Sequence, residues 1–160
     1  MWPSVSSGTQ PAFCGGSFEP SDISSILRKM EYAWPSYDGS NDSFWSHEYD
    51  KHGSCAKDSP GMDTVFGFFN TTIGIWENLD IMGAMNAAGV YPSDSQSYKV
   101  EDIVRGMSQK LGYAPVIGCS DGDINTMALC FDRSLQLGPC PSSLTGCDSD
   151  SYVKLPKASY

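Results

Sequence analysis

The chain has 160 residues, 40% of them hydrophobic, which is enough to bury a core, and we expect residues 1–160 to form a single domain. Its formal net charge of −9 argues against a general nucleic-acid binder, because a polyanion is repelled on approach and releases few counterions. No apolar run approaches the length that spans a membrane.

Residues 21–33 form the first predicted helix. Ser21 suits its N-cap position, and the apolar stripe consists of Ile23, Ile26, Leu27 and Met30. The Trp34-Pro35 step ends this helix, because the residue before a proline avoids helical dihedral angles. The polar residues 36–43 then predict a loop.

The segment Phe44–Cys55, FWSHEYDKHGSC, holds both histidines of the chain together with a glutamate and a lysine. In a helix, His47 pairs with Lys51 and Glu48 with His52 at the four-residue spacing that stacks side chains. All four then fall within about 140° of one helix face. Such a face carries a proton donor or acceptor, a carboxylate to orient it and cations for a phosphate, which predicts a catalytic site.

Zinc binding is the first alternative, because His-Glu followed by another histidine is similar to the metalloprotease pattern, in which two histidines lie four residues apart. Here His52 follows His47 by five residues. Five helical steps rotate a side chain by about 140°, so we do not expect the two imidazoles to converge. The chain has no third histidine, and we predict no metal site.

A solvated polar helix face is the second alternative, since such pairs add only a few tenths of a kcal/mol each. Both histidines of the chain fall in this one segment, however, between aromatic Phe44 and Trp45 and the closing Gly53-Ser54-Cys55. This concentration favours a functional site over a solvated face.

Helices continue through the middle of the chain. Residues 62–79 carry apolar side chains at core spacing, namely Val65, Phe66, Phe69, Ile73 and Trp76. Residues 80–92 predict a connecting segment with a short helix. A further helix over residues 99–111 has Ile103, Val104, Met107 and Leu111 on one side and stops at Gly112.

Strands follow the helices. Residues 116–119 and 125–131 predict two strands around an Asp-Gly turn, and residues 152–155 predict a last one. Helices early in the chain and strands late indicate an α+β fold.

Six cysteines without a Cys-x-x-Cys pair favour disulfides over metal ligands, although spacing alone leaves all 15 pairings open. Two N-glycosylation sequons, Asn41-Asp42-Ser43 and Asn70-Thr71-Thr72, agree with the secretory route.

The segment Phe44–Cys55 closely resembles the second active-site segment of the ribonuclease T2 family, which includes the plant S-RNases and S-like RNases. Trp2-Pro3 resembles the end of that family's first active-site segment, His-Gly-Leu-Trp-Pro, with Met1 at the leucine position. The order of the later segments is also similar to the family, namely Ala88–Pro92, Asp102-Ile103, Gly112–Cys119 and Leu129-Cys130. The resemblance therefore covers nearly the whole chain.

The resemblance implies a disulfide-bonded α+β fold with an antiparallel central sheet and helices packed around it. It implies a metal-free endoribonuclease, without a cofactor, that cleaves single-stranded RNA through a 2′,3′-cyclic phosphate. His52 matches the family's proton acceptor, Glu48 and Lys51 would stabilise the phosphorane-like state, and His47 would help to hold the phosphate.

Trp2 and Phe44 match positions at which the family places aromatic side chains near the bases. For Phe44, packing into the core is an equally good interpretation.

One departure from the family concerns the beginning of the chain. The histidine of the first segment is one of the family's two acid/base catalysts, and this chain starts two residues after its expected position. We expect an N-terminally truncated chain that lacks this histidine and the preceding strand of the central sheet.

By resemblance we also expect three disulfides, Cys14 with Cys55, Cys119 with Cys147, and Cys130 with Cys140. The expected protein is a monomer that is secreted, extracellular or located in an acidic vacuolar or lysosomal compartment.

The leading hypothesis is a ribonuclease whose complete form cleaves single-stranded RNA. The alternative is a non-catalytic storage, defence or interaction protein on the same fold. A third hypothesis, a secreted carbohydrate-binding module, accounts for the aromatic residues but not for the cluster of two histidines, a glutamate and a lysine.

Overall fold

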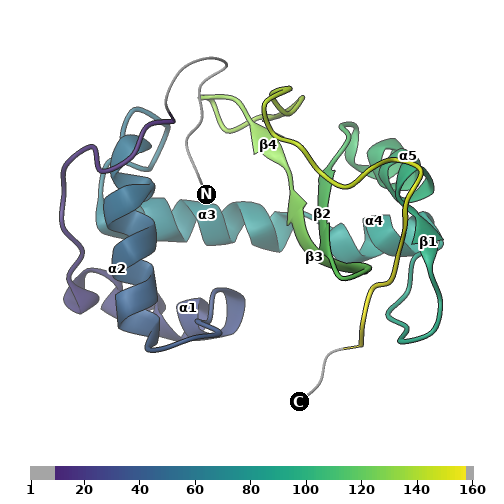
Figure 1. Cartoon of the computed structure of the whole chain (residues 1–160). Coiled ribbons are helices and arrows are strands. Elements are labelled where there is room, and N and C mark those ends of the chain that lie inside the picture. Colours follow the sequence, from purple (N-terminus) through teal and green to yellow (C-terminus); the bar gives the residue numbers. More distant parts are fainter. Residues whose placement is uncertain (1–9, 158–160) are drawn as a thin grey trace. The chain divides into compact units, whose positions relative to one another are not determined.

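The computed structural model describes residues 10–157 and confirms an α+β fold with antiparallel strand pairs (Figure 1). Trp2 lies outside the described residues. The chain divides into two compact units. The first runs up to Leu79 and includes Arg133–Leu135, and the second consists of Asp80–Asp132 and the residues from Gln136 onward.

The first unit is helical. It contains the 3-10 helices η1 (Pro20–Ile26) and η2 (Gly53–Cys55) and the α-helices α1 (Leu27–Ala33), α2 (Asn41–Lys51) and α3 (Val65–Asn78). The predicted helix over residues 21–33 is thus a 3-10 turn followed by a short α-helix, and the loop predicted for residues 36–43 ends three residues early.

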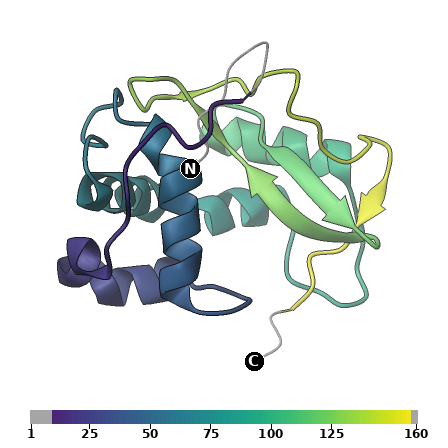
Figure 2. The same ribbon diagram turned by 60° about the vertical axis from the view of Figure 1, so that its left-hand side comes forward.

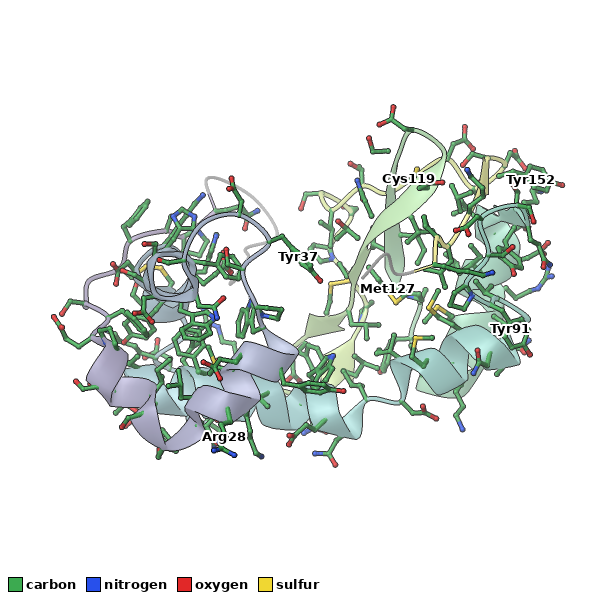
Figure 3. All side chains as sticks on the ribbon, turned by 90° about the horizontal axis from the view of Figure 1, so that it is seen from below. Arg28, Tyr37, Tyr91, Cys119, Met127 and Tyr152 are labelled. Atoms are coloured by element: carbon green, nitrogen blue, oxygen red, sulfur yellow. A yellow bond between two sulfur atoms is a disulfide. The ribbon has the colours of Figure 1, made fainter. Side chains whose placement is uncertain are left out.

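The N-cap predicted at Ser21 is wrong. The chain enters η1 through a capping box formed by Glu19 and Asp22, in which Asp22 Oδ2 accepts from the backbone N–H of Glu19 at 3.1 Å. Two carboxylates at the start of a helix accept hydrogen bonds from its free N–H groups. Their negative charge also interacts favourably with the positive end of the helix dipole, so no serine cap is needed. Arg28 lies on the solvent side of α1, pointing away from the ribbon (Figure 3).

The core of the first unit is aromatic. Phe68 and Phe69 of α3 are fully buried and lie against Tyr49 of α2 and against Trp34. Two residues predicted for this core are exposed instead, Phe66 by 40% and Trp76 by 46%. The sequence pattern predicted a wider buried face than α3 has. Tertiary packing buries only the side of the helix that carries Phe68.

The second unit contains α4 (Ile81–Ala87), α5 (Val100–Leu111) and short strands. The strands are β1 (Tyr98–Lys99), β2 (Val116–Ser120), β3 (Asp123–Ala128), β4 (Cys130–Phe131), β5 (Leu137–Gly138) and β6 (Tyr152–Val153). They pair antiparallel in three sheets of two, β1 with β6, β2 with β3 and β4 with β5.

The β2–β3 hairpin turns at Asp121 and Gly122, both with positive φ of 54° and 83°, as the predicted Asp-Gly turn requires (Figure 2). Next to it, α5 ends at Gly112 with φ 86°, and its buried residues Val100, Ile103 and Met107 face the core of this unit. In the described part of the chain, no helix combines the length and apolar character needed to cross a membrane.

Three disulfides join the cysteine pairs that the family resemblance implies. Cys14–Cys55 lies in the first unit, and Cys119–Cys147 and Cys130–Cys140 lie in the second. Cys119–Cys147 ties the hairpin to the C-terminal segment, where the Cys147 N–H also donates to the Ile117 carbonyl at 2.8 Å.

Candidate active site

Helix α2 carries the cluster and is fixed on its buried side. Ser40 caps its start by accepting from the Ser43 N–H at 3.2 Å. The Trp45 side chain is 1% exposed, and its Nε1 donates to the Trp34 carbonyl at 2.7 Å. Tyr49 packs one turn later against Phe68. These contacts set the rotation of α2 about its axis and therefore the direction of its remaining side chains.

The C-terminal end of α2 is tied to the N-terminal segment. The Phe13 N–H donates to the Lys51 carbonyl at 3.0 Å, and the Cys14 N–H donates to Ser54 Oγ, also at 3.0 Å. Ser54 Oγ in turn donates to the Asp50 carbonyl at 2.7 Å. Together with the Cys14–Cys55 disulfide, these bonds hold the residues around His52 in place.

Three of the predicted site residues meet at this end of the helix. One nitrogen or oxygen atom from each of His47, Glu48 and His52 could serve as a ligand, and these three atoms all lie within 4.8 Å of one another. The two imidazole centroids are 6.2 Å apart. Lys51, one turn after His47, is half-buried on the same stretch of helix.

The expectation that the two imidazoles stay apart is wrong. It assumed an unbroken helix, but His52 is the C-cap of α2 with φ −112° and ψ −54°, and its N–H donates to the Glu48 carbonyl at 3.1 Å. Because its φ departs from the helical value near −63°, its ring does not follow the regular helical rotation. Two imidazoles and a carboxylate are ligand types that zinc accepts, so a test of function has to include a chelator.

Burial differs sharply between neighbouring groups. Glu48 is only 6% exposed, whereas His47 is exposed and His52 is half-buried. Burial lowers the pKa of His52, and the charges of Lys51 and His47 lower it further, while Glu48 opposes them by raising it. A lowered pKa extends the neutral, proton-accepting form of the imidazole to more acidic solution than an ordinary histidine would allow.

Phe44 lies one turn before His47 and Glu48, and it is half-buried against the core of the first unit. It therefore takes part in packing and stays partly accessible to solvent. Trp2, its predicted partner in base binding, lies outside the described residues.

Asp50 is a polar residue of this helix that the sequence analysis missed. Its Oδ2 accepts from Ser46 Oγ at 3.2 Å, and its buried Oδ1 has no hydrogen-bond partner among the described residues. Ser46, Asp50 and Ser54 recur every four residues, and this second polar stripe is the signal that could have revealed the group.

The comparison with protein-family models decides the assignment. Residues 1–140 match the Ribonuclease T2 family. The chain belongs to this family. Membership places it among the ribonuclease T2-type endoribonucleases, consistent with the segment Phe44–Cys55, which spans the end of α2 and η2.

Individual ribonuclease T2 relatives agree along most of the chain. Ribonuclease DdI of Dictyostelium discoideum is 37% identical over 158 residues, which is 98% of this chain and 70% of the relative. Extracellular ribonuclease LE of Solanum lycopersicum is 28% identical over 152 residues, covering 88% of this chain and 65% of the relative. The solved structure of RNase NT in complex with 5′-AMP superimposes with a TM-score of 0.82 at 27% identity, covering 97% of this chain and 79% of that one.

Proposed function

We propose that this ribonuclease T2 family chain contributes the His47, Glu48, Lys51 and His52 cluster to metal-free cleavage of single-stranded RNA. The observation that carries the proposal is the convergence of His47, Glu48 and His52 to within 4.8 Å at the anchored end of α2. The family assignment supports RNA as the substrate.

The proposed reaction is attack of a ribose 2′-oxygen on the adjacent phosphorus. His52 accepts the 2′ proton, the new O2′–P bond forms, and the P–O5′ bond breaks. A general acid protonates the leaving 5′-oxygen, a role for the histidine of the family-type first segment, and the products are a 2′,3′-cyclic phosphate and a free 5′-hydroxyl. Lys51 offers a positive charge to the phosphate oxygens as negative charge builds on them, and the exposed His47 adds a second hydrogen-bond donor through its ring N–H.

Glu48 has two tasks in this proposal. Its carboxylate raises the pKa of His52 and so partly offsets the lowering by burial, which keeps His52 basic enough to take a proton. Because Glu48 is 6% exposed, it also acts from a site with little water, where its charge interacts strongly with the neighbouring imidazoles.

Phe44 is the proposed contact for a base. It precedes His47 by three residues and Glu48 by four, so its ring leaves the same side of α2 as the acid/base cluster. Stacking on an aromatic ring tolerates every base, so this contact would position RNA without selecting a sequence.

Secretion is proposed from the disulfides and from the name of one relative. Three disulfides fit an oxidising compartment, and one relative is named as an extracellular ribonuclease.

The test is cleavage of a single-stranded RNA oligonucleotide near pH 5 in EDTA. It compares the 160-residue chain with a version extended upstream by a family-type first segment, each with and without His52→Ala. We expect His52→Ala to lower the rate of the extended version by about 10²- to 10⁴-fold, and the product to end in a cyclic phosphate. Arg28→Ala, an exposed cation on α1, is the matched control and should leave the rate unchanged.

Three outcomes would contradict the proposal. A rate that falls to background in EDTA and returns with added zinc would indicate a metal-dependent reaction at the same cluster. A rate unaffected by His52→Ala would place the chemistry elsewhere. A folded, extended version with no activity at any mildly acidic pH would favour the non-catalytic alternative.

A further inference from the structure

Two asparagines of the chain stand in the Asn-x-Ser/Thr pattern that accepts an N-linked glycan, Asn41 and Asn70. We propose that Asn70 carries an N-linked glycan, whose first sugar lies against Phe66, and that Asn41 stays unmodified in the folded protein. In the modification, the Asn70 Nδ2 forms a bond to the anomeric carbon of N-acetylglucosamine. The donor is a lipid-linked oligosaccharide, its pyrophosphate leaves from the same carbon, and the amide nitrogen loses one proton.

Asn70 has the accessibility that a glycan requires. It lies in the middle of α3, its side chain is exposed, and within residues 10–157 its amide makes no hydrogen bond. The core of the first unit uses the other side of α3, where Phe68 and Phe69 are fully buried. A sugar on Asn70 therefore replaces water and breaks no contact.

The neighbouring turns of α3 leave room for the sugar and offer it an apolar surface. Gly74 follows one turn after Asn70, and a Cβ built on it would meet nothing within 4 Å. Phe66 precedes Asn70 by one turn and is 40% exposed, although the helical pattern had predicted it to be buried. The apolar face of the first sugar can cover this ring, which gives an exposed phenylalanine a physical role.

Asn41 differs in each of these respects. It is half-buried at the start of α2, and its Oδ1 accepts from the Ser36 N–H at 2.8 Å, a bond that closes the preceding loop. The hydroxyl of its sequon, on Ser43, pairs with Ser40 Oγ at 2.9 Å beside the helix cap. Half-burial and this bond to the loop restrict access to the Asn41 amide nitrogen in the folded chain.

Asn41 also lies on the side of α2 that the proposed function needs. Glu48 follows it by seven residues, close to two full turns, so both side chains leave the same helix face. A bulky glycan there would stand over the approach to the acid/base cluster. Asn70, on the outer face of α3, leaves that approach open.

The test directs the 160-residue chain into the secretory pathway of a eukaryotic host through an added signal sequence. Intact masses, with and without enzymatic glycan removal, are measured in the medium and in the cell lysate. Asn70→Gln and Thr72→Ala remove one sequon, and Asn41→Gln and Ser43→Ala remove the other as matched controls. Because the lysate is measured as well, a variant that folds poorly and is retained still reports its glycan.

We expect one glycan on the parent chain, lost in Asn70→Gln and Thr72→Ala and kept in Asn41→Gln and Ser43→Ala. An unmodified parent chain in both fractions, or a glycan that persists in Asn70→Gln, would overturn the assignment. RNA cleavage is measured separately, so a failure here leaves the proposed function untouched.

The contact with Phe66 has its own readout. Trimming the glycan to a single sugar should leave a melting temperature a few degrees above that of the fully deglycosylated chain. Phe66→Ala should abolish this difference. An equal difference in both proteins would mean that the sugar does not rest on Phe66.

Discussion

At the residue scale, the chemistry of this site depends on three side chains with very different exposure. Glu48 is buried, His52 is half-buried and His47 is exposed, yet one polar atom from each lies within 4.8 Å of the other two. Water screens a buried carboxylate much less than a surface charge, so its effect on a neighbouring imidazole is larger. The direction of each charge effect on His52 can be tested separately.

We predict opposite pKa changes for His52 in two variants. Glu48→Gln removes the charge that raises the pKa of His52 and should lower that pKa further, whereas Lys51→Ala removes a charge that lowers it and should raise it. Titration of the imidazole protons by NMR measures both. Changes of the same sign in the two variants would contradict the electrostatic account.

Folding stability should depend on the same group. Because the pKa of His52 is lower in the folded protein than the ordinary value of about 6.5, the unfolded chain binds the extra proton first. The free energy of unfolding should therefore fall as the pH drops from about 6.5 toward the lowered pKa. In His52→Asn this part of the pH dependence should be absent, which urea unfolding at several pH values would show.

At the element scale, the site depends on how tightly the end of α2 packs against α3. Gly53, directly after His52, is buried, and a Cβ built there would lie 2.8 Å from the rings of Phe68 and Tyr49. The close approach of these rings explains why the turn after the helix has a glycine. No larger side chain fits without moving the aromatic core or the backbone that carries His52.

A pair of glycine substitutions tests this packing. Gly53→Ala should lower the free energy of unfolding by about 1–3 kcal/mol, because it overpacks the core. Gly74→Ala, at an open position within α3, should raise it by about 0.5–1 kcal/mol, because alanine favours a helix. Chemical denaturation of the two variants measures both changes in the free energy of unfolding. If both substitutions destabilise the protein, the effect at Gly53 is not specific to overpacking of the core.

The disulfides should also differ in how much they contribute to folding stability and to RNA cleavage. Cys14–Cys55 closes a sequence separation of 41 residues and Cys130–Cys140 one of 10. Loop entropy then predicts that replacing the first pair by serines costs about 1 kcal/mol more than replacing the second. Only the first replacement should also slow RNA cleavage, since that disulfide holds the end of α2. Equal activity losses in the two double variants would contradict this role.

At the scale of the whole molecule, charge limits how the protein can hold RNA. The net charge is −9, and the proposed site contributes Lys51 and His47 as its basic side chains. On a single-stranded nucleic acid, each phosphate neutralised by a cation adds about 0.7 to the magnitude of the slope of log K against log[salt]. Binding by such a protein must therefore rest on few phosphates and on stacking.

We accordingly predict a shallow salt dependence for kcat/KM on an RNA oligonucleotide. The slope of log(kcat/KM) against log[KCl] should have a magnitude below about 1.5, as one or two phosphate contacts would produce. Lys51→Ala should reduce it, whereas Arg28→Ala should not. A much steeper slope would reveal an extended basic surface that the proposed site does not contain.

Several features could be predicted from local sequence. The cluster Phe44–Cys55, the helix that ends at Gly112 and the Asp-Gly hairpin turn all depend on neighbouring residues, so pattern and turn chemistry suffice for them. Strands β1 and β5 were not predicted, because two residues carry no periodic signal. The core positions assigned to Phe66 and Trp76 were wrong, because which side of α3 is buried depends on the elements packed against it.

Local order along the chain is enough to bring a defined set of chemical groups to the end of one helix, because these groups are near neighbours in sequence, namely His47, Glu48, Lys51 and His52. The tertiary structure alone decided that Glu48 is buried and that His47 and His52 converge. Both depend on where α2 stops and on the aromatic core and disulfide that hold its end. Such contacts join residues far apart in the chain, and a local pattern carries no information about them.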